Sequence, residues 1–315
     1  MKKAWSPVSL RLEKMLLLSH AAAISERPSF WVLFKEITKF RLSISVLFSS
    51  IVGYFLGAEN IDWVVLSLLV LGGYCMVGAS NVFNQIIERD LDAMMERTKF
   101  RPLPSGQMMV SQALILGFLL TLIGLTALYW INPKTAMFGA ISIFLYVSVY
   151  TPLKTKTPLS VFVGAFPGAI PFMLGWVAAT GYFGIEPGTL FMIQFFWQFP
   201  HFWAIGWFLH EDYQRAGFQM LPTAKRDQGT ALQIVLYSVW TALTALIPMV
   251  NKTGRLYLTP VSAIVVGLLG LWLIWASVQL YRLRTEQSAK QLMLVSVTYL
   301  TLIQIIYVID KFFVQ

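Results

Sequence analysis

Charged residues and cysteine are both scarce in this sequence. Only 12% of its 315 residues are charged, against about 25% in typical soluble domains, while 57% are hydrophobic and the mean hydropathy is +0.66. The one cysteine, Cys75, excludes an internal disulfide and leaves the redox compartment undetermined. These shortages exclude an ordinary soluble domain. They predict an all-α, polytopic protein of a lipid bilayer, in which helices satisfy their own backbone hydrogen bonds.

The apolar residues are grouped into long runs that polar loops separate. Roughly 180 residues are apolar, which suffices for roughly nine helices of about 20 residues each. No segment resembles a soluble domain, a low-complexity tract or a long linker. We therefore predict nine transmembrane helices, at residues 42–58, 62–84, 108–131, 135–152, 158–181, 189–209, 230–250, 257–281 and 291–310.

The net charge of +9 could indicate nucleic-acid binding, but the distribution of the basic residues argues against it. With the N-terminus inside, all but four of the 24 Lys and Arg residues fall on inner segments, as expected for orientation signals. We predict a multi-pass protein of the bacterial inner membrane with a basic cytoplasmic tail (1–41) and a membrane domain (42–312). The two longest polar loops, 85–107 and 210–229, then face the cytoplasm and the C-terminus lies outside.

Helix-interrupting residues occur inside two of the predicted spans. Pro167 and Pro171 lie in span 158–181 among several glycines, and Pro200 lies in span 189–209. Small residues allow close helix packing, and prolines open the backbone hydrogen-bond ladder locally. Two interpretations remain open, ordinary packing of a bundle or a wall shaped around a bulky ligand.

The first long loop begins with an acidic stripe at the end of an apolar run. Asn84, Glu88 and Asp92 are spaced four residues apart, so they share one face of a helix. Ionisable residues at a membrane span usually serve a function. Asp90 falls off this stripe, either facing solvent or recruited where the helix frays.

Cations follow these acids within a few residues. Arg97, Lys99 and Arg101 come next, and Pro102 and Pro104 end any preceding helix. Carboxylate and amide oxygens are hard ligands suited to Mg²⁺, while Arg and Lys neutralise phosphate charge. The order of acids and cations therefore predicts a diphosphate bridged by Mg²⁺.

The second long loop repeats this chemistry on the same predicted membrane face. Glu211 and Asp212 lie at the inner rim, with Arg215 after them, and could supply a second metal. His201 lies about two helical turns deeper. It could hydrogen-bond a neighbouring helix, or contact a ligand such as a metal centre or a carboxylate.

Taken together, these motifs resemble the UbiA superfamily of intramembrane prenyltransferases. The 84/88/92 stripe is similar to its Asn-x-x-x-Asp-x-x-x-Asp motif. Over about residues 40–310, the sequence resembles more closely one branch of this superfamily, which prenylates haem. Its elements here are Arg97-Thr98, Arg101-Pro102-Leu103, Tyr150-Thr151 through Lys154 to Pro158, Pro200-His201-Phe202-Trp203, and Asp212-Tyr213 with Ala216-Gly217 and Met220-Leu221-Pro222.

The resemblance implies a nine-helix bundle around a central cavity. It implies Mg²⁺-dependent transfer of farnesyl from farnesyl diphosphate to a vinyl group of haem B, forming haem O. The catalytic residues would be Asn84, Glu88, Asp92 and Asp212, with Asp90 added to them as metal ligands. The substrates would contact Arg97, Arg101, Lys154, Arg215, His201, Tyr150 and Tyr213, and rings such as Tyr150, Tyr213 or Trp203 could stabilise an allylic cation.

Two departures from the superfamily pattern affect the expected metal site. Glu88 stands where the superfamily usually has Asp, and Ala216 stands where a second acid often follows the first by four residues. The number of metals is therefore left open.

Other functions remain as alternatives. A related prenyltransferase could use a quinone precursor or a chlorin as acceptor. A haem or lipid-phosphate transporter could use the acids as a substrate or proton relay, and an oxidase assembly factor is a third class. The haem product would pass to a haem A synthase or a terminal oxidase assembly. No nucleic-acid partner is expected.

Overall fold

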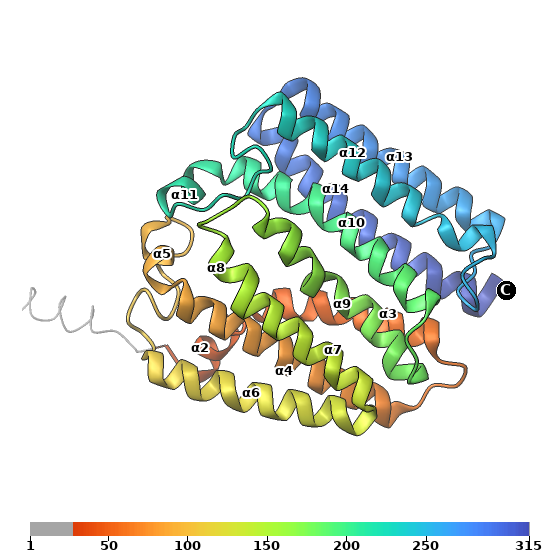
Figure 1. The fold of residues 1–315 in the computed structure, drawn as a ribbon, viewed down its shortest axis with the longest axis horizontal. Coiled ribbons are helices and arrows are strands. Elements are labelled where there is room, and N and C mark those ends of the chain that lie inside the picture. The colour runs from red at the N-terminus through yellow and green to blue at the C-terminus, as the bar shows by residue number, and fades with distance from the viewer. Residues whose placement is uncertain (1–27, 315) are drawn as a thin grey trace, which may run out of the picture.

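The computed structural model describes residues 28–314, and this part of the chain is a bundle of helices with no strand. Long helical segments lie side by side, with the short helices and longer loops gathered at one end (Figure 1). The long segments are α3 (Phe40–Gly57), α4 (Trp63–Ile87), α6 (Val110–Ile131), α7 (Pro133–Phe144) continued by η1 (Leu145–Tyr150) and α8 (Thr151–Leu153), α9 (Ser160–Thr180), α10 (Ile185–Phe208), α12 (Gln228–Thr244) continued by η2 (Ile247–Val250), α13 (Pro260–Leu283), and α14 (Glu286–Ile309) continued by η3 (Asp310–Val314).

Each of the nine predicted spans corresponds to one of these segments. Within the described residues, eight segments are long and apolar enough to cross a membrane. The remaining one, α10, has 24 residues, sufficient length for a bilayer core at 1.5 Å per residue. Its interior carries Gln194, Gln198 and His201, which lower its hydropathy. The protein is thus a multi-span membrane protein, and α10 carries polar side chains within its length.

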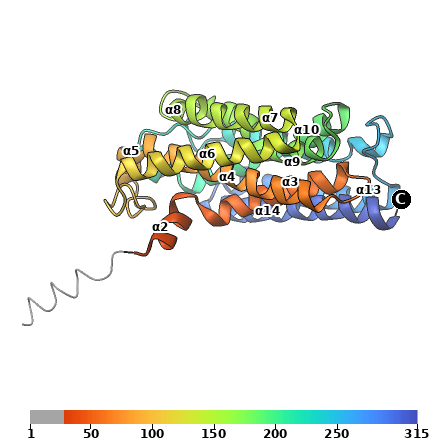
Figure 2. The ribbon, with the colours of Figure 1, turned by 90° about the horizontal axis from the view of Figure 1, so that it is seen from below.

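The folded part extends N-terminal to the predicted boundary at residue 42. Helix α2 (Phe30–Ile37) lies at the edge of the bundle (Figure 2) and is tied to α4. Gln85 Nε2 donates to the Ile37 carbonyl over 2.7 Å, and the Thr38 and Tyr74 hydroxyls are 3.1 Å apart. Residues 1–27 of the predicted basic tail lie outside the described residues.

Helices α3 and α9 cross with their backbones in contact. A Cβ on Gly53 would lie 2.0 Å from the Phe172 carbonyl oxygen, and one on Gly175 would lie 1.9 Å from that of Ser50. Neither distance is compatible with a side chain, so only glycine permits this crossing. The larger hydrophobic core, which includes Phe172, Trp207 and Tyr299, fills the space between α9, α10 and the C-terminal helices.

The glycines of α9 also shape a cavity. A Cβ on Gly168 would lie 1.9 Å from Gln198 Oε1, and both residues line the space described below. Pro167, Pro171 and Pro200 are accommodated within their helices. Helix α9 thus packs closely on α3, as the packing interpretation expects, and it contributes Gly168 to the cavity wall beside Gln198 of α10. That the interrupters shape a wall around a bulky ligand stays a prediction.

Candidate active site

A cavity of about 460 Å³ lies among α3, α4, η1, α10 and α14. This volume is within the range of small-molecule sites. Acidic and basic side chains line it near the C-terminal end of α4, and apolar and aromatic side chains line the rest. Its apolar residues include Phe48, Trp197, Phe202, Val297 and Leu300. The cavity can therefore hold a ligand that has one highly charged part and one apolar part.

The acidic stripe lies at the charged part of this cavity, as the spacing predicted. Helix α4 ends at Ile87 and α5 (Arg89–Met94) begins two residues later. The i to i+4 bonds nevertheless continue, from Glu88 N to Asn84 O (2.9 Å) and from Asp92 N to Glu88 O (2.7 Å). Asn84, Glu88 and Asp92 thus stay on one face, and all three are buried.

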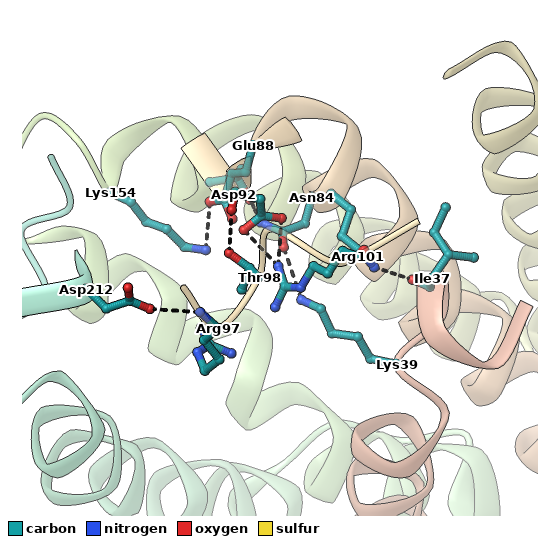
Figure 3. Close-up of polar contacts among 12 residues, drawn as sticks. Ile37, Lys39, Asn84, Glu88, Asp92, Arg97, Thr98, Arg101, Lys154 and Asp212 are labelled. Atoms are coloured by element: carbon teal, nitrogen blue, oxygen red, sulfur yellow. Dashed lines mark hydrogen bonds and ion pairs between the residues drawn. The ribbon is translucent and has the colours of Figure 1, made fainter. Parts of the chain in front are cut away.

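Each buried carboxylate of the stripe is paired with a cation from elsewhere in the site (Figure 3). Lys154 Nζ lies 2.8 Å from Glu88 Oε1. Arg101 Nη1 lies 2.9 and 2.7 Å from the two oxygens of Asp92. Thr98 Oγ1 donates to the Asp92 carbonyl over 2.8 Å and so fixes the loop that carries Arg101. Buried charges are stable only when paired in this way.

Lys154 shows how strongly these groups interact. Burial by itself would lower the pKa of its ammonium, but the Glu88 carboxylate, with Tyr146 and Tyr213, outweighs burial and raises the pKa of Lys154. The ammonium also lies 4.7 Å from the centre of the Tyr150 ring, close enough for a cation–π contact. Lys154 is therefore a fixed positive charge at the cavity.

Lys39 belongs to the site, although its position in the sequence predicts only a role in membrane orientation. Its Nζ donates to Asn84 Oδ1 over 3.2 Å, while Asn84 Nδ2 donates to Thr151 Oγ1 over the same distance. Burial, then repulsion from Arg101 and Lys154, lowers the pKa of Lys39 to about 7. The only sequence signal was its place at the inner rim of the first span, because its partner is 45 residues away.

The second loop approaches the site through Asp212, but not as the sequence suggested. Asp212 lies on α11 (His210–Arg215) and does not line the cavity. Its Oδ1 accepts the Glu96 amide over 2.8 Å, its Oδ2 accepts the Arg97 amide over 3.4 Å, and Arg215 Nη1 lies 3.4 Å from Oδ1. Asp212 thus joins the two loops and holds the backbone beside Arg97.

The other expected acids lie apart from the cavity. The side chain of Asp90 is 84% exposed and pairs with Arg89 over 2.9 Å. The adjacent guanidinium, by a hydrogen bond and by its charge, lowers the pKa of Asp90. Glu211 is exposed and lies 3.8 Å from Arg226. The structure does not bring Asp90, Glu211 or Arg215 to the cavity wall, because each occupies a solvent-facing position of a short helix.

Most of the remaining expected contacts do line the cavity. Arg97, Tyr150, Tyr213 and His201 all contribute to its wall. Trp203 does not, since it is buried against Phe199 and Tyr237. The cavity therefore gathers nine of the residues predicted for the site, namely Asn84, Glu88, Asp92, Arg97, Arg101, Tyr150, Lys154, His201 and Tyr213.

The donor chemistry fits a magnesium ion that binds together with a phosphate ligand. Among residues 28–314, no group of three or more His, Cys, Asp or Glu side chains is arranged to hold a metal alone. The cavity offers the oxygens of Asn84, Glu88 and Asp92. Mg²⁺ is commonly bound by one or two carboxylates and completed by substrate phosphates, which is what this set can provide.

The cavity wall also carries an excess of positive charge. Three cations, Arg97, Arg101 and Lys154, face two carboxylates, Glu88 and Asp92, and Lys39, whose pKa is lowered to about 7, adds to the positive charge when it is protonated. A metal alone would meet repulsion from this wall, whereas a polyanion would be attracted to it. The charge balance therefore suits a diphosphate with its metal better than a free cation.

The sequence matches a known family over most of the membrane domain. Residues 46–302 match the UbiA prenyltransferase family. This chain belongs to that family. Similar UbiA-family proteins include one of Christiangramia forsetii, 68% identical over 89% of this chain and 93% of its own length, and one of Flavobacterium psychrophilum, 67% identical over 89% and 94%. Both relatives are named protoheme IX farnesyltransferase.

Solved structures show the same UbiA fold at low sequence identity. A digeranylgeranylglyceryl phosphate synthase structure superposes with a TM-score of 0.74 at 17% identity, covering 89% of this chain and 97% of that one. A UbiA homologue of Archaeoglobus fulgidus bound to GPP and Mg²⁺ superposes with a TM-score of 0.64 at 14% identity, covering 87% and 99%. The predicted fold class is confirmed.

Proposed function

We propose that this UbiA-family protein transfers farnesyl from farnesyl diphosphate to a vinyl group of haem B, forming haem O. Relatives at 62–68% identity carry the name protoheme IX farnesyltransferase. The observation that carries the proposal within this chain is the cavity itself. It joins a cluster of buried acid–cation pairs to an apolar, aromatic compartment, which suits a diphosphate attached to a prenyl chain.

The charged end supports departure of the diphosphate. Asn84, Glu88 and Asp92 would hold Mg²⁺, which would withdraw electron density from the diphosphate and make it a better leaving group. Arg101 and Lys154 already lie within ion-pair distance of the two carboxylates, so they are placed to neutralise phosphate oxygens next to the metal. Arg97 and, when it is protonated, Lys39 also carry positive charge, and their attraction to the diphosphate would strengthen as the leaving group separates.

The apolar end serves the carbon chemistry. The farnesyl carbon–oxygen bond breaks with its electron pair leaving on the diphosphate, and the haem vinyl group attacks the allylic cation. Water adds to the resulting cation beside the macrocycle and loses a proton. The balance is haem B, farnesyl diphosphate and water giving haem O, diphosphate and a proton. No protein nucleophile is required, and the rings of Tyr150 and Tyr213 at the cavity wall can face positive charge.

The site belongs, in this proposal, on the cytoplasmic side of the bacterial inner membrane. Helices α5 and α11 and the N-terminal end of the described chain lie at one end of the bundle, and the C-terminal end lies at the other (Figures 1 and 2). Of the basic residues counted above, most of those within residues 28–314 lie in or beside the elements at the former end, in agreement with the positive-inside rule. Farnesyl diphosphate would then reach the site from the cytoplasm, and haem O would pass to a haem A synthase or an oxidase assembly.

A transporter function is disfavoured by where the charges lie. Transporters usually bind their substrate near the membrane midplane, between broken helices. The buried ion pairs described here all involve the end of α4, the loop after α5 and the end of α8. This placement favours chemistry on a ligand anchored at one membrane surface.

A direct assay tests the proposal. Purified protein is incubated with haem B, farnesyl diphosphate and Mg²⁺, and the haem is analysed by mass spectrometry. We expect haem O, and we expect EDTA to abolish its formation and excess Mg²⁺ to restore it. A matched reaction replaces haem B with an aromatic quinone precursor. Unchanged haem from folded protein, or prenylation of the quinone precursor alone, would refute the haem acceptor.

A further inference from the structure

The hydrogen bonds around His201 fix the tautomer of its imidazole. Ser296 on α14 donates its hydroxyl proton to the Met293 carbonyl over 2.7 Å. The hydroxyl has only one proton, so when that proton is donated to the Met293 carbonyl, the serine oxygen accepts at the 2.9 Å contact with His201 Nδ1. We therefore assign the proton of the neutral imidazole to Nδ1. This leaves an unprotonated lone pair on Nε2.

The second nitrogen of this imidazole is available to a ligand. His201 lines the cavity. Its ring contacts Ser296 through Nδ1, and it also interacts with the Met293 backbone, whose carbonyl accepts the Ser296 hydroxyl. His201 Nε2 is not among the fully buried side-chain atoms that have no hydrogen-bond partner. Within residues 28–314 no side chain hydrogen-bonds Nε2, so this nitrogen is available to a ligand in the cavity that His201 lines.

The ring is also held in a fixed orientation. It stacks on Trp197, with ring centroids 4.6 Å apart and planes inclined by 16°. Trp197 Nε1 in turn donates to the Ser296 carbonyl over 2.6 Å. One serine of α14 therefore positions both rings, through its hydroxyl and its carbonyl. Metal-ligating histidines characteristically have their second nitrogen anchored to an oxygen in this manner.

We propose that His201 Nε2 is the axial ligand of the haem iron and holds the acceptor during farnesyl transfer. This inference rests on the function proposed above and adds a specific contact between protein and acceptor. Neutral imidazole is a common ligand of haem iron. The aromatic wall of Trp197 and Phe202 beside the ring provides an apolar surface for the macrocycle.

The position of His201 agrees with the place that the acceptor needs. It precedes Phe208, the last residue of α10, by seven positions, about 10 Å along a helix. The ion pairs of Glu88 and Asp92 lie just beyond the end of α4, at the same end of the bundle (Figure 1). Iron ligation at His201 would hold the macrocycle deeper than the diphosphate and within the same cavity, so that a vinyl group can face the prenyl carbon.

Spectroscopy of the ferrous haem complex tests this ligation without relying on turnover. Full-length protein is reconstituted with ferrous haem B, and resonance Raman spectra are recorded. We expect an iron–histidine stretching band in the wild-type complex. His201→Gly should lose the band, and free imidazole should restore an iron–imidazole band by occupying the vacated space. His210→Ala is the matched control and should keep the band, since His210 does not line this cavity.

Haem affinity and a variant of the anchoring serine extend the test. We expect His201→Ala to weaken haem B binding at least about tenfold, and Ser296→Ala to weaken it about tenfold and lower the band frequency. Binding of farnesyl diphosphate with Mg²⁺ should be unchanged in both variants. This unchanged binding shows that the variants are folded.

The outcomes separate the ligation from the enzyme activity. Haem O formation by a wild-type protein whose ferrous complex lacks the band would overturn the ligation and leave the proposed function intact. A band that depends on His201, without any haem O formation, would overturn the proposed function and leave the ligation intact. Loss of activity in His201→Ala with an unchanged wild-type-like Raman spectrum would assign His201 to proton transfer and overturn the ligation.

Discussion

At the scale of single residues, the carboxylates of Glu88 and Asp92 differ from the other acids discussed because they are buried and each holds a cation. Removing one partner of a buried ion pair leaves the other charge uncompensated, which is strongly unfavourable. The same pairs set the electrostatics of catalysis, because a bound diphosphate would share the cations that the carboxylates now hold. Substitutions at these positions should therefore affect chemistry far more than substitutions at exposed acids nearby.

Asp92 and Asp90 allow a matched comparison two residues apart. We expect Asp92→Ala to lower the rate of haem O formation at least about 10²-fold, because it removes a metal oxygen and leaves Arg101 without its partner. Asp90→Ala should change the rate little, since its side chain faces solvent. Membrane insertion, measured by yield and gel filtration, should be normal for both. Equal loss in the two variants would contradict the site described here.

The sequence revealed those residues whose partners follow from helical periodicity. Asn84, Glu88 and Asp92 could be grouped because positions four apart share a face in any helix. Lys39 could not be found in this way, since its contact with Asn84 depends on how α2 and α3 pack on α4. The sequence predicts Asp212 as a metal ligand from its place at the inner rim, and that role stays a prediction. The contacts of its oxygens with backbone amides of a loop more than 110 residues away depend on tertiary packing, so they leave no signal in the sequence.

At the scale of elements, the crossing of α3 and α9 fixes one wall of the bundle. We expect Gly175→Ala to destabilise the protein by about 1–3 kcal/mol or more, because the added methyl group would overlap the Ser50 carbonyl. Gly267→Ala on α13 is the control, since a Cβ there meets no atom within 4 Å. Thermal unfolding in detergent measures both. Similar melting temperatures for the two variants would show that the helices can separate without cost.

The N-terminus of α12 offers a pH-dependent test of local stability. Asp227 caps this helix by accepting the Thr230 amide over 2.8 Å, and this bond lowers the pKa of Asp227. A lowered native pKa stabilises the fold above the usual carboxyl value and loses that effect as the pH falls through the native value. Asp227→Ala should cost about 1 kcal/mol at pH 7, and the difference in melting temperature should shrink below about pH 4. Asp227→Asn, which keeps an acceptor, should lose less at pH 7; an equal loss would argue against capping.

The elements themselves were largely predictable, because each long apolar run must satisfy its backbone in lipid by forming a helix. All nine predicted spans overlap long helical segments of the described chain. The π-helical segment η1, which brings Tyr146 and Tyr150 to the cavity, was not foreseen. Such wide turns arise from local packing and leave no periodic pattern in the sequence. Helix α2 was not predicted either, because eight residues are too few for a membrane span.

At the scale of the whole molecule, the ends of the bundle differ in chemistry. The short helices α5 and α11 and the loop that follows α5 share one end (Figure 1). Arg97 and Arg101 of this loop line the charged part of the cavity. Asp212 joins the two loops there through the amides of Glu96 and Arg97. The orientation of the bundle in the membrane therefore decides which compartment supplies the diphosphate substrate.

Cysteine labelling can establish that orientation with little interference. The one native cysteine, Cys75, is buried, so the parent protein should not react with a membrane-impermeant maleimide. We expect Lys252→Cys to be labelled in intact cells. Lys156→Cys should be labelled only after the membrane is permeabilised. Both native lysines are exposed, so access alone should not distinguish them. The opposite pattern would place the charged end of the cavity outside the cytoplasm.

The two buried ion pairs also constrain how the chain is assembled during synthesis. Asp92 finds Arg101 only nine positions later, so this pair can form as soon as the first loop emerges. Glu88 must wait for Lys154, which lies 66 residues and two membrane spans further along the chain. Until then its carboxylate should remain hydrated at the bilayer surface, and α4 should not settle to its final depth. A nascent chain arrested before residue 154 should therefore leave a probe at position 88 open to water, and one arrested well beyond it should not.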